Sequence, residues 1–344
     1  MGLGRFLPAV GGVLLAVLVT TGVSAAAAPA GGLWRPLLKV PGIVDVAGPR
    51  ADGQLVLSTK NGLFLLGPDR ATQAFADGAG GYTAGGGEPY IALAYGQRVW
   101  GVSGCSFAPG EVFALDAGST PGIVRVLPSG RAFRFLDFPP GAFPSGIAFD
   151  RFGRFGYRLL VTATFDDNAT TSLYAIDCLG HLSVIAQGAP HVEGGIVVAP
   201  PTFGHFGGDL IAADENSGRV YAFARDGSVE PVVDSGLPSG GDIGVEALGF
   251  VPGRLGPGAA AYLPDLGAPG SPTPGDDSLL VLRGRDLTAA SLHPGELVAA
   301  TEAGGMTIAI DCRATCSVRQ VANGLPTTHG EGHIAFVAGP GRSG

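Results

Sequence analysis

The feature that most constrains this fold is a unit of four short apolar runs between residues 192 and 233, because the pattern recurs along the chain. The runs are 195–199, 209–213, 219–224 and 228–233. Glycine, asparagine and aspartate turns separate them, which is typical of antiparallel strands joined by hairpins. If the unit repeats, it predicts a β-propeller, in which four-stranded blades surround a central channel.

Similar units recur at spacings of roughly 50 residues in the first part of the chain, as expected of propeller blades. Their inner strands begin near Gly42, Glu88, Ser145, Glu193, Glu246 and Glu331. We therefore predict an all-β, six-bladed propeller over residues 42–339. Seven blades, with residues 287–292 belonging to another blade, is the alternative, and an array of β-sandwiches is the competing architecture.

The strand pattern is irregular after residue 245. The runs 245–252, 259–264 and 278–284 resemble a fifth blade. The runs 296–301, 306–311 and 317–322 resemble a sixth blade without an inner strand, which residues 330–339 would supply. A C-terminal strand in this role closes the ring and removes exposed sheet edges.

The N-terminal 28 residues have the pattern of a secretory signal peptide. Arg5 precedes an apolar run at 10–19, and small residues follow at 23–30. We predict cleavage between Ala25 and Gly31. A retained membrane anchor is the weaker alternative, because the apolar run is shorter than the roughly 20 residues that a membrane span needs. We expect a secreted, periplasmic or cell-envelope protein, with residues 29–41 as a lead segment and 340–344 as a tail.

Charge and composition limit the partners. The 344 residues carry a formal net charge of -8, and the only lysines are Lys39 and Lys60. Without a basic cluster, nucleic acid is not an expected partner, and the lysine-poor, glycine-rich composition favours a bacterial source. After signal cleavage no stretch is long enough to cross a membrane. We expect a small-molecule ligand or substrate, and the oligomeric state stays open.

The four cysteines fit an exported protein, because an even count in an oxidising compartment favours disulfides. Of the three possible connectivities we favour Cys105 with Cys178 and Cys312 with Cys316, since the second pair is only four residues apart. The spacing does not favour a metal site on these cysteines.

Acidic residues recur at one repeat position. Glu88, Glu193, Glu246 and Glu331 each stand at or near the start of a proposed inner strand. In a propeller these positions converge on one mouth of the channel, where the carboxylates repel one another unless a cation neutralises them. This predicts a divalent metal, Ca²⁺ before Mg²⁺. Asp242, shortly before Glu246, is a further candidate for the mouth, although a loop-stabilising role is its simpler interpretation.

Three short motifs carry a family resemblance. Glu88-Pro89-Tyr90, the segment 144–150 and the segment 192–196 resemble the E-G-P, P-N-G-[LI]-x-F and P-D-G-[ML] motifs of the senescence marker protein-30/gluconolactonase-like family of six-bladed propellers, of calcium-dependent phosphotriesterase type. The resemblance implies that Glu88, Ser145 and Glu193 hold a channel metal and that Glu193 is the base for lactone hydrolysis. Ser145 stands where the family has Asn, and Glu193 where it has Asp.

Histidines flank two of these glutamates. His191 precedes Glu193 by two residues, and His329 and His333 lie two residues on either side of Glu331. Alternation along an extended chain puts such pairs on one face, as acid/base or metal-binding groups. Ordinary loop histidines are the alternative. Residues 214–216 are predicted to form a hairpin turn and its flank.

These features lead to one functional hypothesis with two alternatives. The first is an exported lactonase- or esterase-type hydrolase, in which a divalent ion at the channel mouth polarises the carbonyl and Glu193, tuned by His191, activates water. The alternatives are a non-catalytic propeller that binds a ligand or a protein, and a quinone-dependent sugar dehydrogenase with His329 or His191 as base. The sequence has no G-x-S-x-G, P-loop or HExxH motif, and it leaves open whether the protein is an enzyme.

Overall fold

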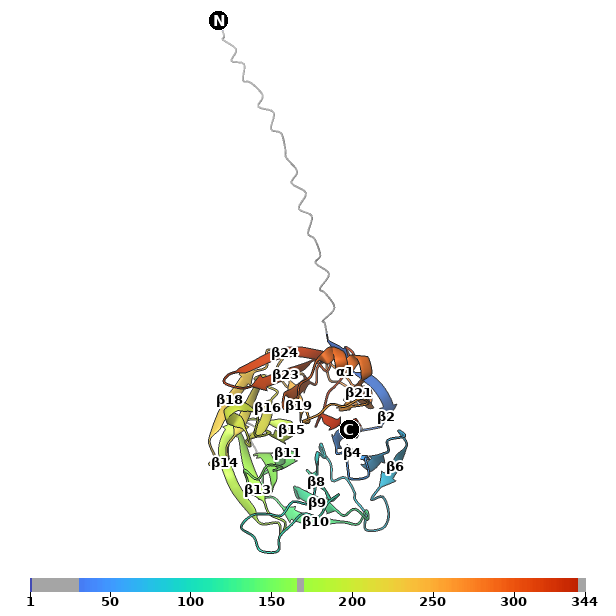
Figure 1. Ribbon diagram of the computed structural model, residues 1–344, viewed down its shortest axis with the longest axis vertical. Coiled ribbons are helices and arrows are strands. Elements are labelled where there is room, and N and C mark those ends of the chain that lie inside the picture. The colour runs from blue at the N-terminus through green and yellow to red at the C-terminus, as the bar shows by residue number, and fades with distance from the viewer. Residues whose placement is uncertain (2–30, 166–169, 340–344) are drawn as a thin grey trace.

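The fold is a six-bladed β-propeller. The computed structural model describes residues 31–165 and 170–339, together with Met1. These residues form six small sheets arranged as a ring around a central channel (Figure 1). The predicted signal peptide, apart from Met1, and the tail at 340–344 lie outside the described residues.

The first four blades follow the chain, each running from an inner to an outer strand. Blade 1 is β3 (Ile43–Ala47), β4 (Leu55–Thr59), β5 (Gly62–Leu66) and β6 (Thr72–Phe75). Blade 2 is β7 (Ile91–Leu93), β8 (Val112–Asp116), β9 (Gly122–Val126) and β10 (Ala132–Asp137). Blade 3 is β11 (Phe143–Phe149), β12 (Leu159–Thr164), β13 (Thr170–Ile176) and β14 (Leu182–Pro190). Blade 4 is β15 (Glu193–Val198), β16 (Leu210–Asp214), β17 (Arg219–Phe223) and β18 (Val229–Asp234).

The last two blades are interleaved in sequence. Blade 5 is β19 (Val245–Phe250), β22 (Leu297–Thr301), β23 (Thr307–Cys312) and β24 (Cys316–Asn323), extended by the parallel strand β1 (Gly32–Leu33). Blade 6 is β25 (Ala335–Val337), β20 (Ala260–Asp265), β21 (Ser278–Arg283) and the N-terminal strand β2 (Arg35–Lys39). Two short helices accompany the strands, η1 (Gly204–Phe206) and α1 (Gly284–Ala290).

The inner strands of these two blades are exchanged relative to the prediction from the sequence, which was wrong here. It placed β19 with β20 and β21, whereas β19 pairs with β22, and β25 pairs with β20. Both inner strands carry similar buried patterns and contact each other in the channel wall. The hydrophobic pattern therefore fits either pairing.

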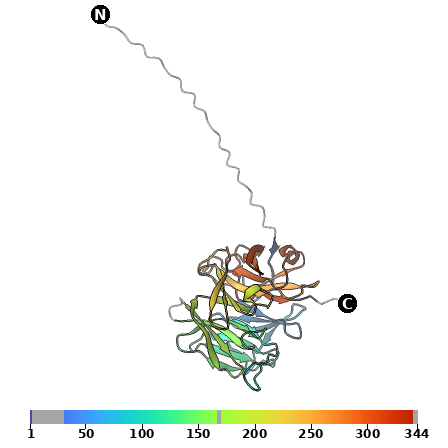
Figure 2. The same cartoon turned by 60° about the vertical axis from the view of Figure 1, so that its left-hand side comes forward.

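The C-terminal β25 closes the ring as predicted, but it does so in blade 6 beside β20, and not beside the strand at 297–301. The N-terminal β2 is the outer strand of the same blade, pairing with β21. Figure 2 shows the blue N-terminal strands beside the orange and red C-terminal ones. The segment 29–41 thus contributes strands β1 and β2 to the propeller, and residues 287–292 lie in α1 and the turn after it, not in a seventh blade.

The core lies between neighbouring blades, because inner and middle strands bury both faces. Every residue of β12 is buried, whereas the outer strand β10 has no buried residue. Between blades 2 and 3, Phe107, Phe113 and Phe149 pack edge to face with ring centroids 4.9–5.5 Å apart. Aromatic pairs of this geometry stabilise a core beyond the area they bury.

Two disulfides join loops to this framework. Cys105 pairs with Cys178 and Cys312 with Cys316, which is the predicted connectivity. The first ties the loop before β8 to the end of β13, and the second spans the β23–β24 turn. Among the described residues, no helix has the length and apolar character needed to cross a membrane.

Candidate metal centre

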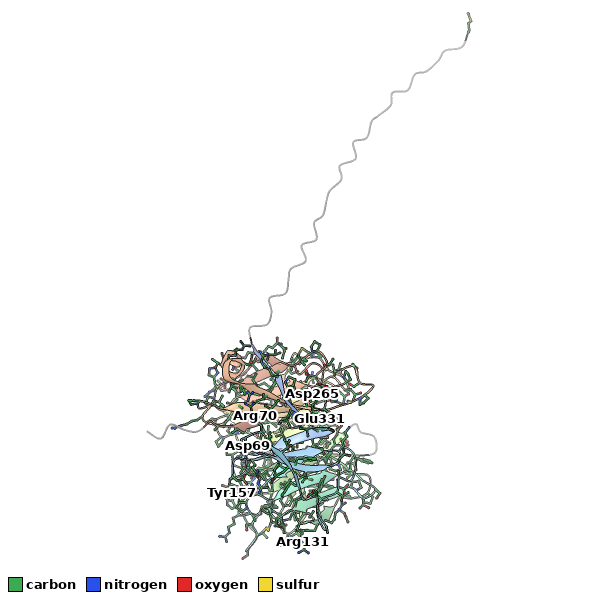
Figure 3. All side chains as sticks on the ribbon, turned by 90° about the vertical axis from the view of Figure 1, so that its right-hand side faces the viewer. Asp69, Arg70, Arg131, Tyr157, Asp265 and Glu331 are labelled. Atoms are coloured by element: carbon green, nitrogen blue, oxygen red, sulfur yellow. A yellow bond between two sulfur atoms is a disulfide. The ribbon has the colours of Figure 1, made fainter. Side chains whose placement is uncertain are left out.

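Glutamates from different blades meet at one mouth of the channel, where the inner strands begin. The hydroxyl of Tyr90 lies 3.0 Å from Glu88 Oε2, 2.6 Å from Glu246 Oε1 and 2.5 Å from Glu331 Oε1. Glu193 joins them, since it offers a carboxylate oxygen within 4.8 Å of oxygens of Glu88 and Glu246. The structure thus brings together the four glutamates named by the sequence. Figure 3 labels Glu331 and, near it, Asp265.

The Tyr90 hydroxyl cannot satisfy these three carboxyl groups alone. A phenol has one proton to donate, so it gives a hydrogen bond to one carboxylate only. Tyr90, Glu246 and Glu331 are at most 3 % exposed, so water does not compensate. The remaining carboxyl groups must therefore be protonated, or a cation must lie among them.

His329 lies on the side of the cluster formed by blades 5 and 6. Its Nδ1 donates to the carbonyl oxygen of Thr273 over 3.0 Å. Its Nε2 lies 3.0 Å from Glu302 Oε1 and 3.8 Å from Glu331 Oε2. A histidine with Nδ1 fixed by a backbone carbonyl has the usual orientation of a metal ligand, with Nε2 facing the ion. Without an ion, Nε2 carries a proton towards Glu302.

His191 and Glu193 form a pair at the open side of the mouth. His191 Nε2 lies 3.5 Å from Glu193 Oε2. The side-chain amide of Asn216 lies 3.4 Å from His191 Nδ1, so that when it donates there, the proton of the neutral ring is on Nε2, facing the carboxylate. Burial lowers the pKa of His191 against the opposing effect of Asp214, which favours this neutral ring.

Burial and mutual repulsion disfavour ionisation of the cluster. Burial, followed by the charges of Glu88, Glu302 and Asp242, raises the pKa of Glu193 to about 7. Burial raises the pKa of Glu215 to about 8, together with its hydrogen bond to Glu302 and the charge there. The pKa values of Glu246 and Glu331 are raised well above the usual range, first by burial and then by neighbouring carboxylates. His329 responds oppositely: burial lowers its pKa, but the contact with Glu302 outweighs this and raises it.

Sequence reasoning missed two acidic members of the cluster, Glu215 and Glu302. Both belong to groups of possible metal ligands, one of which joins them to Glu246. Residues 214–216 form the predicted turn, in which Asp214 accepts hydrogen bonds from backbone amides, and Glu215 in this turn also faces the cluster. Each missed glutamate follows the second strand of its blade, which ends beside the start of the inner strand. An acidic residue directly after the second strand of a blade is therefore the sequence signal that could have revealed Glu215 and Glu302.

Three other predicted residues lie around the cluster. Ser145 donates its hydroxyl to the carbonyl of Val192, 3.1 Å away. Asp242 is exposed at the rim, where its backbone amide donates to Glu215 Oε2 over 3.3 Å. His333 lies deeper in the channel than the mouth, because its ring contacts Asp45 and not the glutamates.

The His333–Asp45 pair stabilises the channel wall. Nδ1 of His333 lies 2.9 Å from Asp45 Oδ2, and Nε2 lies 3.0 Å from the carbonyl oxygen of Ile196. Both acceptors require a donor, so the ring is an imidazolium. Burial alone lowers the pKa of His333, but the charge of Asp45 raises it overall. Asp45 also accepts from the backbone amide of Ile91, so it links blades 1, 2 and 6.

The residues of the mouth fit a divalent cation. Carboxylate oxygens are the ligands that Ca²⁺, Mg²⁺ and Mn²⁺ prefer, whereas imidazole suits Zn²⁺, Fe²⁺ and similar transition metals. Glu302 Oε2 is buried without a hydrogen-bond partner in the described part of the chain. A buried polar atom in this state is costly unless something coordinates it, which supports a ligand role for Glu302.

The comparisons with known proteins find structural neighbours only. No protein-family model matches the chain, and no curated protein matches its sequence. Gluconolactonase and regucalcin propellers are among the neighbours. A Xanthomonas campestris gluconolactonase has a TM-score of 0.49 at 13 % identity, over 88 % of this chain and 84 % of that one. The calcium-binding protein regucalcin from Agrobacterium tumefaciens has a TM-score of 0.46 at 11 % identity, over 86 % and 79 %.

A virginiamycin B lyase from Staphylococcus aureus is also similar in fold. Its TM-score is 0.39 at 13 % identity, and the similarity covers 55 % of this chain. The chain spans 54 % of the length of that lyase.

Proposed function

We propose that the acidic mouth binds a divalent cation, Ca²⁺ before others, and that the protein uses it to hydrolyse a lactone or a similar ester. The observation that supports this most is the Tyr90 hydroxyl, which lies against three carboxyl groups, two of them buried, that its single proton cannot satisfy. A bound cation would neutralise them and polarise the substrate carbonyl.

Glu88, Glu193 and Glu246 are the residues that would hold the cation, because their oxygens lie within 4.8 Å of one another. Glu302, Glu331 and His329 form a neighbouring group of the same kind. Tyr90 has a positioning role, since its hydroxyl lies at the centre of the group, 3.0 Å from Glu88 and 2.6 Å from Glu246.

Glu193 is suited to act as the base. Its side chain is 30 % exposed, unlike the deeper glutamates, and His191 lies beside it. In hydrolysis, Glu193 accepts a proton from water as the water oxygen bonds to the carbonyl carbon. It then returns that proton to the ester oxygen as the carbon–oxygen bond breaks. His191 lies beside this carboxylate, with its Nε2 3.5 Å from Glu193 Oε2.

We propose that this occurs in an exported, bacterial protein. The two disulfides support export, because such bonds persist in oxidising compartments. We expect a small-molecule substrate and no nucleic-acid or membrane partner for the mature chain.

The test combines elemental analysis with turnover of a lactone and ester panel. The purified protein is expected to carry about one divalent ion, to lose turnover with EDTA and to regain it with Ca²⁺. Glu193→Gln is expected to abolish most turnover, with Glu230→Gln, an exposed residue outside the cluster, as the matched control. Metal binding without turnover of any member of the panel would favour the ligand-binding alternative over the hydrolase.

A further inference from the structure

The opposite end of the channel contains a cavity that shares no lining residue with the acidic mouth. Its volume is about 700 Å³, within the roughly 300–1,000 Å³ of small-molecule sites. All six inner strands line it, and each contributes an apolar side chain: Val46, Leu93, Ile147, Val198, Phe250 and Phe336. Four of the inner strands, β7, β15, β19 and β25, have a cluster glutamate at or near their start and end at this cavity, so the two sites lie at opposite ends of these strands.

The charge of this cavity is opposite to that of the mouth. Among the described residues, its lining includes Arg151, Arg313 and His333 but no aspartate or glutamate. The whole chain, in contrast, has a net charge of -8. Arg313 is paired with Asp311 at 3.0 Å, and His333 with Asp45. Arg151 has no carboxylate within ion-pair distance in the described part of the chain, so its charge is available to a ligand.

Arg151 is held at the rim of the cavity. Its guanidinium carbon lies 3.9 Å from the centroid of the Tyr95 ring, a cation–π contact that orients a side chain otherwise free in solvent. Tyr95 and Phe152, which follows Arg151 in the chain, are 40 % and 41 % exposed, and both line the cavity. An apolar interior with one oriented cation and exposed aromatic rings at its opening suits a ligand with an apolar body and an anionic end.

We propose that this cavity binds an amphiphilic carboxylate, with the aliphatic or aromatic body in the channel and the carboxylate on Arg151. Arginine binds carboxylates through a planar fork of N–H donors. The apolar body gains free energy by leaving water for the lining of the inner strands. The site shares no residue with the acidic mouth, and its ligand requires no metal.

The experiment measures binding of decanoate by calorimetry, with decanol and decyltrimethylammonium as neutral and cationic ligands of equal chain length. Decanoate is expected to bind more tightly than either. Arg151→Gln should weaken the affinity for decanoate about five- to tenfold and leave the affinity for decanol unchanged. Arg225 is exposed and does not line the cavity, so Arg225→Gln should change neither affinity.

A second variant tests the location. Thr202 is exposed and lines the cavity, so Thr202→Trp should narrow the opening and weaken decanoate and decanol alike. EDTA treatment should leave decanoate binding unchanged, so failure of the metal proposal would not affect this one. Any of three results would overturn the proposal: decanoate does not bind, the cationic ligand binds as tightly as decanoate, or Arg151→Gln and Arg225→Gln have equal effects.

Discussion

The hydroxyl of Tyr90 lies 2.6 Å from Oε1 of Glu246, although the two residues are 156 positions apart. Tyr90 precedes the inner strand of blade 2 and Glu246 lies in that of blade 5, so the contact joins opposite sides of a six-membered ring. The hydrogen bond therefore crosses the channel directly. This contact makes the mouth one connected group of side chains and not six separate strand ends.

Replacing Tyr90 with phenylalanine removes the donor shared by the buried carboxyl groups. We expect Tyr90→Phe to lower the free energy of unfolding of the metal-free protein by about 1–3 kcal/mol, because a buried acceptor loses its partner. Tyr82→Phe is the matched control: the Tyr82 hydroxyl is buried without a hydrogen-bond partner among the described residues, so its removal should be neutral or stabilising. Denaturant unfolding measures the free energy of unfolding of both variants. Equal changes would contradict the role of the Tyr90 hydroxyl as a donor to the buried carboxyl groups.

The stability of the metal-free protein should fall as the pH rises. The pKa of Glu193 is raised to about 7 and that of Glu215 to about 8 from an ordinary value of 4.5. Groups with raised folded-state pKa values favour protonation in the folded protein. Their stabilising effect is complete below pH 4.5 and is lost as the pH rises through about 7 and 8.

Thermal unfolding in EDTA at about pH 5 and about pH 8.5 measures this dependence. We expect a lower melting temperature at the higher pH, and added Ca²⁺ should restore it there. The double variant Glu193→Gln, Glu215→Gln should reduce the dependence, whereas the exposed Glu230→Gln should not. A metal-free protein that is more stable at the higher pH would argue against a buried, repulsive cluster.

Asp45 should be important for stability and not for metal binding. Its carboxylate is fully buried and pairs with His333 while accepting the backbone amide of Ile91. Asp45→Asn leaves a buried imidazolium without its counter-charge, so we expect a loss of about 3–5 kcal/mol. Asp77→Asn, at an exposed position, should change stability by less than about 0.5 kcal/mol. If both variants had an equal, small effect in denaturant unfolding, the Asp45–His333 pair would not stabilise the channel wall.

The two disulfides should contribute unequally. Cys105 and Cys178 are 73 residues apart, whereas Cys312 and Cys316 are four apart. Cross-linking distant residues restricts the unfolded chain more, so we expect the double alanine variant of the first pair to lose about 4 kcal/mol, and that of the second pair less. Chemical denaturation of both variants tests this, and a larger loss for the second pair would refute the order.

The sequence was sufficient to predict the strands and the number of blades. It was not sufficient to predict that blades 5 and 6 exchange their inner strands. Alternating apolar runs and turn residues predict where strands begin, and the 192–233 unit matches β15 to β18 closely. The partner of an inner strand is a different question, because β19 and β25 are buried alike. Which hairpin each of them joins depends on chain connectivity in space, and a local pattern does not encode that.

The same distinction applies to the candidate site. Glu88, Glu193, Glu246 and Glu331 share a repeat position, so the sequence places them together. Glu302 follows β22, at the end of a second strand, and only the antiparallel pairing of Val245 with Thr301 brings it to the mouth. Tyr90 lies in the Glu88-Pro89-Tyr90 motif, but its contact with Glu246 crosses the ring, and the repeat spacing does not predict such a contact.

Calorimetric titration of Ca²⁺ into the metal-free protein at neutral pH tests the central claim most directly, with Glu246→Gln measured beside the wild type. We predict saturable binding of about one ion, weakened at least about tenfold by Glu246→Gln, which removes one buried carboxylate charge. The same variant should melt at a higher temperature than the wild type in EDTA, because it removes a buried carboxyl group that must take up a proton when the protein folds. Absence of binding to the wild type, or unchanged affinity in Glu246→Gln, would contradict a metal centre at this mouth.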